Sequence, residues 1–530
     1  MAGLRELIQL TAVLNDLRAK FPVVCVLCIP WISTKHPLHP VQEELLTGKP
    51  SPTRLSDTEA HTHWLMPVVH ALMESRSLIL RASLCAGNSI RLTIKLFQLK
   101  RIFQRELDRV KAAQFAVIAK TWCFGPERKS DDDFYYGDLQ LRLASNDVSM
   151  LLLCGDANNS DWKIFAKSHF SISGSFRVPE LVLAPMHAPL ALAVSQILTA
   201  LRLRGHAYRS RDPLARRAAR QASIDVLSPA VTQAGLIHDI TRIAVRTWRP
   251  RAFLTLYEGH GWEKSAWWAA KQENRECRTV GYQHTVLFST QLSMLQPFVD
   301  IRDRSVPDIV LALGNHTAAL IDSEHRKYGV KTVRFGTFRR NVPVAPRVAD
   351  PERRTVLVIP EGIVSEMEFL FTFAAQCAKI MPSYTFVLRA HPKWAPSKAV
   401  RNITDSLLGG NVTWSTGSIE NDFLRSAVML YRGSSTVLQG VLQGLLPVYV
   451  TIPGGTISDP ISGLTTWRQV CSSPENFSDT VKRFESQHPD LRNEDWLMAL
   501  NYVEDYIPPV NDESIKAFLQ AIGNDSGGFV

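Results

Sequence analysis

Hydrophobic and polar positions in the last third of the chain switch between short apolar runs and longer segments with helical spacing. Residues 355–359 form a β-branched run, and apolar residues then recur at intervals of three and four from Met367 to Met381. The same pattern predicts strands at 384–388, 411–414, 428–431 and 447–452, and helices at 419–427 and 437–444. Strands that alternate with helices predict a parallel sheet covered on both faces.

A second block of the same kind lies upstream. Its pattern predicts strands at 252–257, 278–283 and 309–313, and a helix at 263–272. Between the blocks, residues 339–351 include three prolines and show little periodicity, which is typical of a linker. We therefore expect two facing α/β domains, each with a Rossmann-like parallel sheet. Ligands of open parallel sheets bind beyond the carboxyl ends of the strands, so the facing loops would form a cleft.

These patterns predict a domain at 1–338 with insertions, a linker at 339–352, and a domain at 353–530 that ends in a helical tail. The first 230 residues are less regular, with a strand expected at 23–29 and helices at 65–80 and 90–114. An apolar stretch near 181–203 is interrupted by prolines and polar residues. It is therefore expected to be buried or interfacial and not to span a membrane.

Composition narrows the class of protein. The 530 residues are 45% hydrophobic and 21% charged, which excludes wholesale disorder and a coiled coil. Eight scattered cysteines, including Cys25 and Cys28, indicate reduced thiols, and no secretory signal is visible, so a cytoplasmic location is expected. The net charge of +10 suits an anionic partner. Basic modules interleaved with aromatic residues are not evident, so nucleic acid is not expected as a partner.

A hydroxyl-rich strand-to-helix junction in the second block suits a phosphate, because free amides and the helix dipole meet there. The junction is Gly433-Ser434-Ser435-Thr436, and the alternative is that these residues only cap the helix. Other polar residues follow neighbouring strands of the same predicted sheet, namely Glu361, Gly362, Arg389, His391, Pro392 and Lys393. A basic strand end beside such a helix start predicts a site for a nucleotide phosphate.

The first block places a carboxylate and an imidazole in a glycine-permitted loop, Glu258-Gly259-His260, directly after a predicted strand. A carboxylate there can take a proton from an acceptor hydroxyl, or it can merely cap the next helix. Glu263 is a rival base. His284 follows the next strand and either joins the same cleft or is a polar core residue. No P-loop, HExxH or GxSxG motif occurs.

Three short motifs carry a family resemblance. Glu258-Gly259, His391-Pro392 and Ser434-Ser435 resemble, in order, motifs of bacterial sialyltransferases and related capsule transferases that use CMP-activated sugars. The chain also resembles surface-carbohydrate enzymes of capsule and lipopolysaccharide synthesis, including Kdo transferases, which have the GT-B fold. The resemblance implies that Glu258 deprotonates the acceptor, His391 protonates or binds the departing phosphate, and the two serines hold that phosphate.

One position departs from the family pattern. The first residue of the acidic pair is Tyr257 in this chain, so His260 and Glu263 also stay candidates for the base.

The resemblance implies an inverting, metal-independent glycosyltransferase that moves a nonulosonate-type or Kdo-type sugar from CMP to a surface glycan or lipid-linked glycan. The first domain would bind the acceptor, the second the donor, and no cofactor is expected. Alternatives are a transferase that uses CDP-glycerol or a UDP-sugar, and a non-catalytic protein that binds glycans or polyanions. Seven arginines within 202–220 are expected to touch the inner face of the cytoplasmic membrane or an anionic acceptor, unless they only form a solvated helix face.

Overall fold

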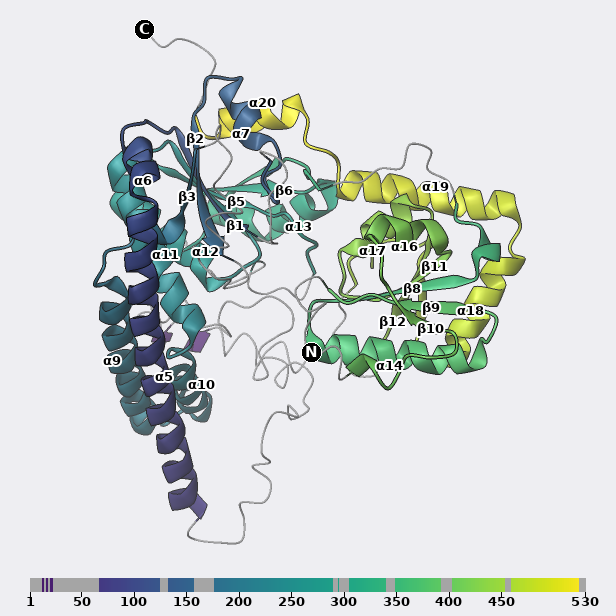
Figure 1. The fold of residues 1–530 in the computed structure, drawn as a ribbon, viewed down its shortest axis with the longest axis horizontal. Coiled ribbons are helices and arrows are strands. Elements are labelled where there is room, and N and C mark those ends of the chain that lie inside the picture. The colour runs from purple at the N-terminus through teal and green to yellow at the C-terminus, as the bar shows by residue number, and fades with distance from the viewer. Residues whose placement is uncertain are drawn as a thin grey trace.

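The chain forms two α/β domains, which lie side by side in Figure 1. The computed structural model describes residues 66–123, 132–156, 176–288, 294, 305–339, 348–391, 403–452 and 459–523, together with 12–13, 16–17 and 20–21. Each domain contains one sheet in which every pairing is parallel. The predicted fold class, α/β with two Rossmann-like parallel sheets, is confirmed.

Among the described residues, the sheet of the first domain has seven strands in the order β3-β2-β1-β4-β5-β6-β7. Its strands are β1 (Val117–Cys123), β2 (Met150–Asp156), β3 (Arg177–Pro179), β4 (Ala252–Leu256), β5 (Arg278–Tyr282), β6 (Ile309–Ala312) and β7 (Lys331–Arg334). Central strand β4 is buried along its whole length, as its run of apolar residues predicts. The strands predicted at 252–257, 278–283 and 309–313 each extend one residue beyond the observed element.

Helices of the first domain cover its sheet and extend beyond it (Figure 1). They are α5 (Met66–Ile102), α6 (Gln104–Lys111), α7 (Leu139–Ala144), α9 (Ala188–Arg209), α10 (Pro213–Asp225), α11 (Pro229–Trp248), α12 (Gly261–Glu273) and α13 (Asn315–His325). The two helices predicted at 65–80 and 90–114 are wrong as separate elements, because α5 is continuous. Small side chains at Cys85 and Ser89 are buried and continue its inward face across the expected break. The strand predicted at 23–29 lies outside the described residues.

The sheet of the second domain has six strands in the order β10-β9-β8-β11-β12-β13. Its strands are β8 (Thr355–Pro360), β9 (Thr385–Leu388), β10 (Val412–Trp414), β11 (Val428–Arg432), β12 (Leu446–Val450) and β13 (Gln469–Cys471). Its helices are α14 (Val364–Ile380), α16 (Ile419–Arg425), α17 (Thr436–Leu442), α18 (Pro474–Ser486) and α19 (Pro489–Tyr506). Each strand predicted for this domain is present within two residues of its expected ends.

The end of the chain returns to the first domain. Helix α20 (Asp512–Ala521) follows α19, and its Phe518 ring lies 6.1 Å from the ring of Phe335, which follows β7. Val510, Ile515 and Phe518 belong to the core of the first domain. The predicted helical tail therefore packs on the first sheet, while the boundaries at 338 and 352 stay a prediction.

The structure tests two further expectations from the sequence only in part: that the cysteines are reduced and that no segment spans a membrane. Six of the eight cysteines lie in the described ranges, and all six are buried and unbridged. Cys25 and Cys28 lie outside those ranges. Among the described helices, none combines the length and apolar character that a membrane span needs.

Candidate functional site

A carboxylate between two imidazoles follows strand β4. Oε2 of Glu258 lies 3.2 Å from Nε2 of His260, and Oε1 of Glu258 lies 3.1 Å from Nε2 of His284. The His260 side chain is 42% exposed, Glu258 is 19% exposed and His284 is 3% exposed, so the group runs from the surface into the domain. An exposed imidazole backed by a carboxylate can accept a proton from a substrate hydroxyl. The structure brings together Glu258, His260 and His284.

Glu263 holds the backbone of this loop. Its carboxylate accepts hydrogen bonds from the amides of Glu258 at 3.0 Å, Gly259 at 2.8 Å and His260 at 3.0 Å. The side chain is fully buried, and burial raises the pKa of Glu263 to about 7 against the opposing effect of these bonds. Glu263, and not Glu258, therefore satisfies the amides of the loop that leads into helix α12.

The residue before Glu258 belongs to the core. Tyr257 is 3% exposed, and its ring meets the ring of Trp267 edge to face at 5.0 Å. A packing residue therefore stands where the resembling motif has the first member of its acidic pair.

Two residues beside the site, Tyr135 and Arg339, could not be predicted from the sequence pattern. The ring of Tyr135 lies 4.6 Å from the ring of His284, and burial together with the Glu258 carboxylate raises the pKa of Tyr135. The guanidinium of Arg339 lies 4.8 Å from the ring centroid of Phe134 and 5.7 Å from that of Tyr135. Tyr135 lies in a segment without periodicity, and Arg339 opens the predicted linker, so neither could be found by its spacing.

Polar loops converge at the carboxyl ends of β8, β9 and β11 in the second domain. A Cβ atom at Gly362 would lie 3.2 Å from the ring of His391, and one at Gly433 would lie 2.3 Å from Oε2 of Glu361. Gly433 has a φ of +68°, a conformation that favours glycine. The structure therefore brings together Glu361, Gly362, His391 and Gly433.

A buried arginine anchors this edge. Arg432 ends β11 and is 2% exposed. Its Nε donates to Glu366 in the first turn of α14 at 2.7 Å, and an Nη donates to the hydroxyl of Tyr449 at 2.8 Å. Arg432 was missed because the predicted strand ended one residue earlier. A charged residue directly before Gly433 is the sequence signal that could have identified it.

The serines after Gly433 lie at the start of the short helix α17. The Oγ of Ser434 accepts a hydrogen bond of 3.4 Å from the amide of Thr436, and Ser435 makes no side-chain bond to the helix start. Ser434 thus makes one weak capping contact. The role of these hydroxyls in holding a phosphate stays a prediction.

Arg389 lies in a different network. One of its Nη atoms donates to Oγ of Ser415 at 2.8 Å, to the carbonyl of Gly417 at 2.9 Å and to Oδ2 of Asp422 at 2.6 Å. These contacts direct the guanidinium toward β10 and α16. Pro392 and Lys393, which were predicted beside His391, lie outside the described residues.

The two polar edges are connected through one contact between the domains. Nε2 of Gln439, in α17, donates to the carbonyl oxygen of Arg339 at 3.3 Å. Arg339 in turn contacts Tyr135, which packs on His284. A chain of contacts therefore links the Glu258 cluster to α17.

A cavity of about 250 Å³ lies between the domains. It is lined by Leu287 and Phe288 after β5, by His316 in α13, and by Asp459 and Tyr502 of the second domain. None of the predicted site residues lines it. Within the described ranges, no group of three His, Cys, Asp or Glu side chains is placed to hold a metal ion.

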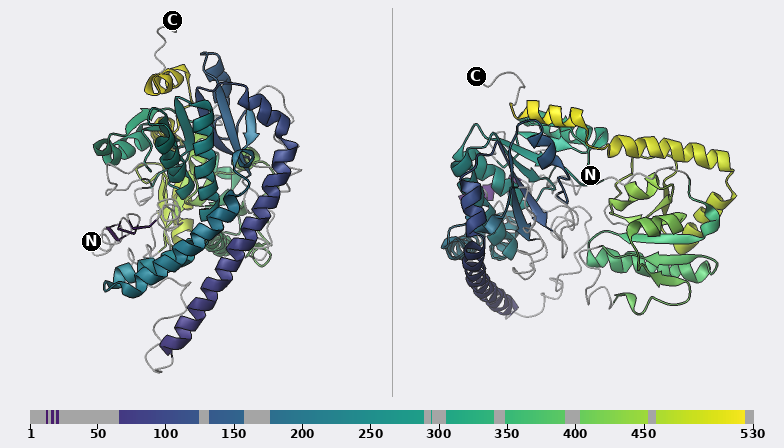
Figure 2. Two further views of the ribbon diagram at one scale, coloured as in Figure 1. Left: turned by 90° about the vertical axis from the view of Figure 1, so that its left-hand side faces the viewer. Right: turned by 45° about the horizontal axis from the view of Figure 1, so that its top comes forward.

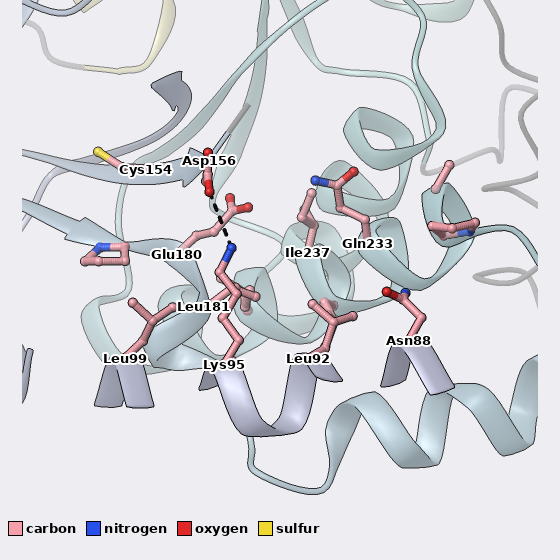
Figure 3. Close-up of a pocket in the computed structure, with 15 residues that line it drawn as sticks. Asn88, Leu92, Lys95, Leu99, Cys154, Asp156, Glu180, Leu181, Gln233 and Ile237 are labelled. Atoms are coloured by element: carbon pink, nitrogen blue, oxygen red, sulfur yellow. Dashed lines mark hydrogen bonds and ion pairs between the residues drawn. The ribbon is translucent and has the colours of Figure 1, made fainter. Parts of the chain in front are cut away.

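A second cavity of about 250 Å³ opens at the carboxyl ends of β2 and β3, between α5 and α11 (Figure 3). Nζ of Lys95 lies 3.4 Å from Oδ2 of Asp156 at its polar end, where Glu180 also points. Behind this end, the buried Lys120 lies 3.3 Å from Glu180 and 3.0 Å from the ring centroid of Trp122. Sequence reasoning did not predict this cluster.

Comparisons with known proteins give information on the fold alone. Neither a family model nor a curated protein matches the chain. A structure of an S. aureus TarM mutant with UDP and a glycan matches at a TM-score of 0.38 and 11% identity, over 54% of this chain. This chain spans 59% of the length of TarM.

Two other solved structures match over a larger part of the chain. The S. aureus MnaA–UDP structure matches at a TM-score of 0.44 and 11% identity, over 78% of this chain and 99% of MnaA. A glycosyltransferase from Rickettsia africae matches at a TM-score of 0.44 and 10% identity, over 78% of this chain and all of that protein.

Proposed function

We propose that this chain is a GT-B glycosyltransferase that moves a sugar from a pyrimidine-nucleotide donor to a glycan acceptor. The observation that carries the proposal is the chain of contacts that links the two polar edges through Arg339 and Gln439. One edge offers a base, formed by Glu258 and His260, and the other places His391 against Gly362, next to Glu361, which lies against Gly433 before α17. Such a reaction needs a base on one side and groups for the departing phosphate on the other.

The two edges have separate roles in the proposed transfer reaction. The acceptor oxygen attacks the anomeric carbon from the face opposite the leaving group, so the configuration inverts, and its proton passes to the Glu258–His260 pair. The bond between the anomeric carbon and the phosphate oxygen breaks, and the electron pair leaves with the phosphate. His391 and the hydroxyl of Ser434 would stabilise that charge, which is commonly the largest contribution to such a rate.

We assign the base to the Glu258–His260 pair and not to Glu263. The Glu263 side chain is fully buried, and its carboxylate already accepts three amide hydrogen bonds. The His260 ring is nearly half exposed and stands at the outer end of the Glu258 cluster. A substrate hydroxyl can reach His260 or Glu258 without opening the loop.

Three donor classes contain a pyrimidine nucleotide. UDP is named for both the TarM and the MnaA structures, so we take a UDP-sugar as the first donor. A CMP-activated nonulosonate or Kdo is the second, supported by the ordered motifs at Glu258, His391 and Ser434. A role in capsule or lipopolysaccharide synthesis follows from the same resemblance. CDP-glycerol remains a third donor, and the absence of a metal or cofactor requirement stays a prediction.

The test is a donor panel on the full chain. UDP-N-acetylglucosamine, UDP-glucose, CMP-N-acetylneuraminate, CMP-Kdo and CDP-glycerol are each incubated with the protein, and nucleotide release is followed with and without a glycan extract. We expect release from one donor class, enhanced by the extract and lost in His391→Ala. A protein that binds glycans without catalysis would release no nucleotide from any donor, and this result would contradict the proposed function.

A further inference from the structure

Helices α5 and α9 each expose a row of apolar side chains in addition to their buried face. The row on α5 consists of Ile79, Ile90, Ile94 and Phe97, which are 54–68% exposed. The row on α9 consists of Leu190, Val194, Leu198 and Leu201, which are 44–58% exposed. Intervals of three, four, seven and eleven residues place each row on one side of its helix. We call these eight residues the outer face.

The two rows form one continuous surface. An apolar groove of about 410 Å³ lies between the helices and is lined by Ile79 of one row and Leu201 of the other. The helices also contact each other at Cys85 and Gln196, whose Sγ and Oε1 atoms are 3.6 Å apart. Exposed apolar surfaces of this extent mark sites of interaction with a protein or a membrane.

Positive charge surrounds the outer face. Residues 78–102 of α5 and all of α9 together carry eight lysines and arginines and no aspartate or glutamate. Arg91, Arg101, Arg202 and Arg209 are exposed, and Arg101 lies one turn beyond Phe97 on the same side of α5. A second copy of the chain would bring like charges together at this surface, whereas the phosphates of an anionic bilayer would attract them.

We propose that the outer face docks on an anionic lipid bilayer. The apolar rows enter the headgroup region, and the surrounding arginines contact lipid phosphates, which is the division of roles in interfacial amphipathic helices. The residues differ from those that the sequence suggested. Within 202–220, Arg204 is buried, and Arg216 donates to the carbonyl of Ser210, so this segment only partly faces outward.

The position of the outer face keeps the second domain away from the bilayer. Helices α5 and α9 lie at the side of the first domain remote from the second, as both Figure 1 and the right view of Figure 2 show. The second domain, with His391 and α17, would thus stay open to a water-soluble donor. The docking does not depend on the proposed transferase function, because it rests on surface residues outside the candidate site.

The experiment is co-sedimentation of the full chain with vesicles. One set contains phosphatidylcholine with 30% phosphatidylglycerol, and the other contains phosphatidylcholine alone. We expect at least tenfold stronger binding to the anionic set. The double variant Ile94→Asp/Leu198→Asp should lose at least tenfold, and Arg202→Glu/Arg209→Glu should lose the preference for anionic vesicles.

The matched control is Leu424→Asp/Leu491→Asp, which places the same two charges at leucines of the second domain that are 64% and 54% exposed. It should bind vesicles as the wild type does, and circular dichroism should show all variants folded. Equal binding by the wild type and the Ile94→Asp/Leu198→Asp variant would overturn the proposal. A wild-type dimer that this double variant dissociates, without vesicle binding, would assign the surface to a second copy instead.

Discussion

Oε1 of Glu258 lies 3.1 Å from Nε2 of His284, a histidine that follows the neighbouring strand of the same parallel sheet. Because β4 and β5 end side by side, the fold itself sets this contact, and the buried imidazole fixes the carboxylate that supports the exposed His260. A candidate base is thus built by adjacent strand ends and not by one contiguous motif.

Glu258→Gln keeps the size of the side chain but removes its charge. If the Glu258–His260 pair accepts the proton, kcat should fall by roughly 10²–10⁴-fold, while the melting temperature changes little. The measurement is nucleotide release from the donor that the panel selects. The exposed Glu276→Gln serves as control and should keep full activity. A Glu258→Gln variant with wild-type kcat would remove this residue from the reaction.

Glu263 makes stability depend on pH. Its pKa is about 7 in the folded chain against 4.5 for a free side chain, so the unfolded state loses the proton first as pH rises. The stabilising contribution is complete below about pH 4.5 and is lost as pH approaches 7, by about 3 kcal/mol at most. Urea unfolding of wild type and Glu263→Gln from pH 4.5 to 7.5 measures this difference.

Glu263→Gln will lower stability at every pH, since the amide cannot accept all the backbone hydrogen bonds. The informative quantity is therefore the change with pH. The wild type should lose stability relative to the variant as pH rises. Parallel curves for the two proteins would show that Glu263 does not titrate in this range.

Gly362→Ala tests the placement of His391. The added Cβ would lie 3.2 Å from the imidazole, so the ring must move by a few tenths of an ångström. We expect kcat to fall about tenfold or more, because small misplacements of a catalytic group are costly, and nucleotide binding to weaken less. Gly87→Ala, where a Cβ meets no atom within 4 Å, is the control. Equal kcat for wild type and Gly362→Ala would mean that the position of His391 does not matter.

Lys120 and Glu180 are buried together, and each should neutralise the charge of the other and so stabilise the first domain. Burial lowers the pKa of Lys120 and raises that of Glu180, and the two side chains lie 3.3 Å apart. Lys120→Met leaves the carboxyl without its partner and should cost about 3–5 kcal/mol of unfolding free energy. Lys120→Met/Glu180→Leu should recover most of that loss. Chemical denaturation of the three proteins gives the values, and a double variant as unstable as the single one would refute the compensation.

The sequence predicts the sheets well and the site only partly. Strand positions after residue 250 follow from apolar runs between turn residues. Neighbouring parallel strands end at the same edge, which brings His284 near Glu258 and His391 near Gly362. The contacts of Arg389 with Asp422, and of Arg432 with Glu366, depend on side-chain directions that spacing does not contain. Tyr135 reaches the site from a segment without periodicity.

The continuous helix α5 shows a second limit of pattern reading. Its middle contains Gly87 and small polar residues, which lower the apparent helical signal, yet burial of Cys85 and Ser89 against neighbouring helices keeps the element intact. Tertiary contacts supply what intrinsic propensity lacks there.

The most direct test of a shared transfer site is a structure of the protein with UDP or CMP bound. We expect the nucleotide phosphate within hydrogen-bond distance of His391 and Ser434, at the edge of the second sheet that faces Glu258. Density for the nucleotide in the cavity between α5 and α11, or away from both polar edges, would show that these two edges do not form one transfer site.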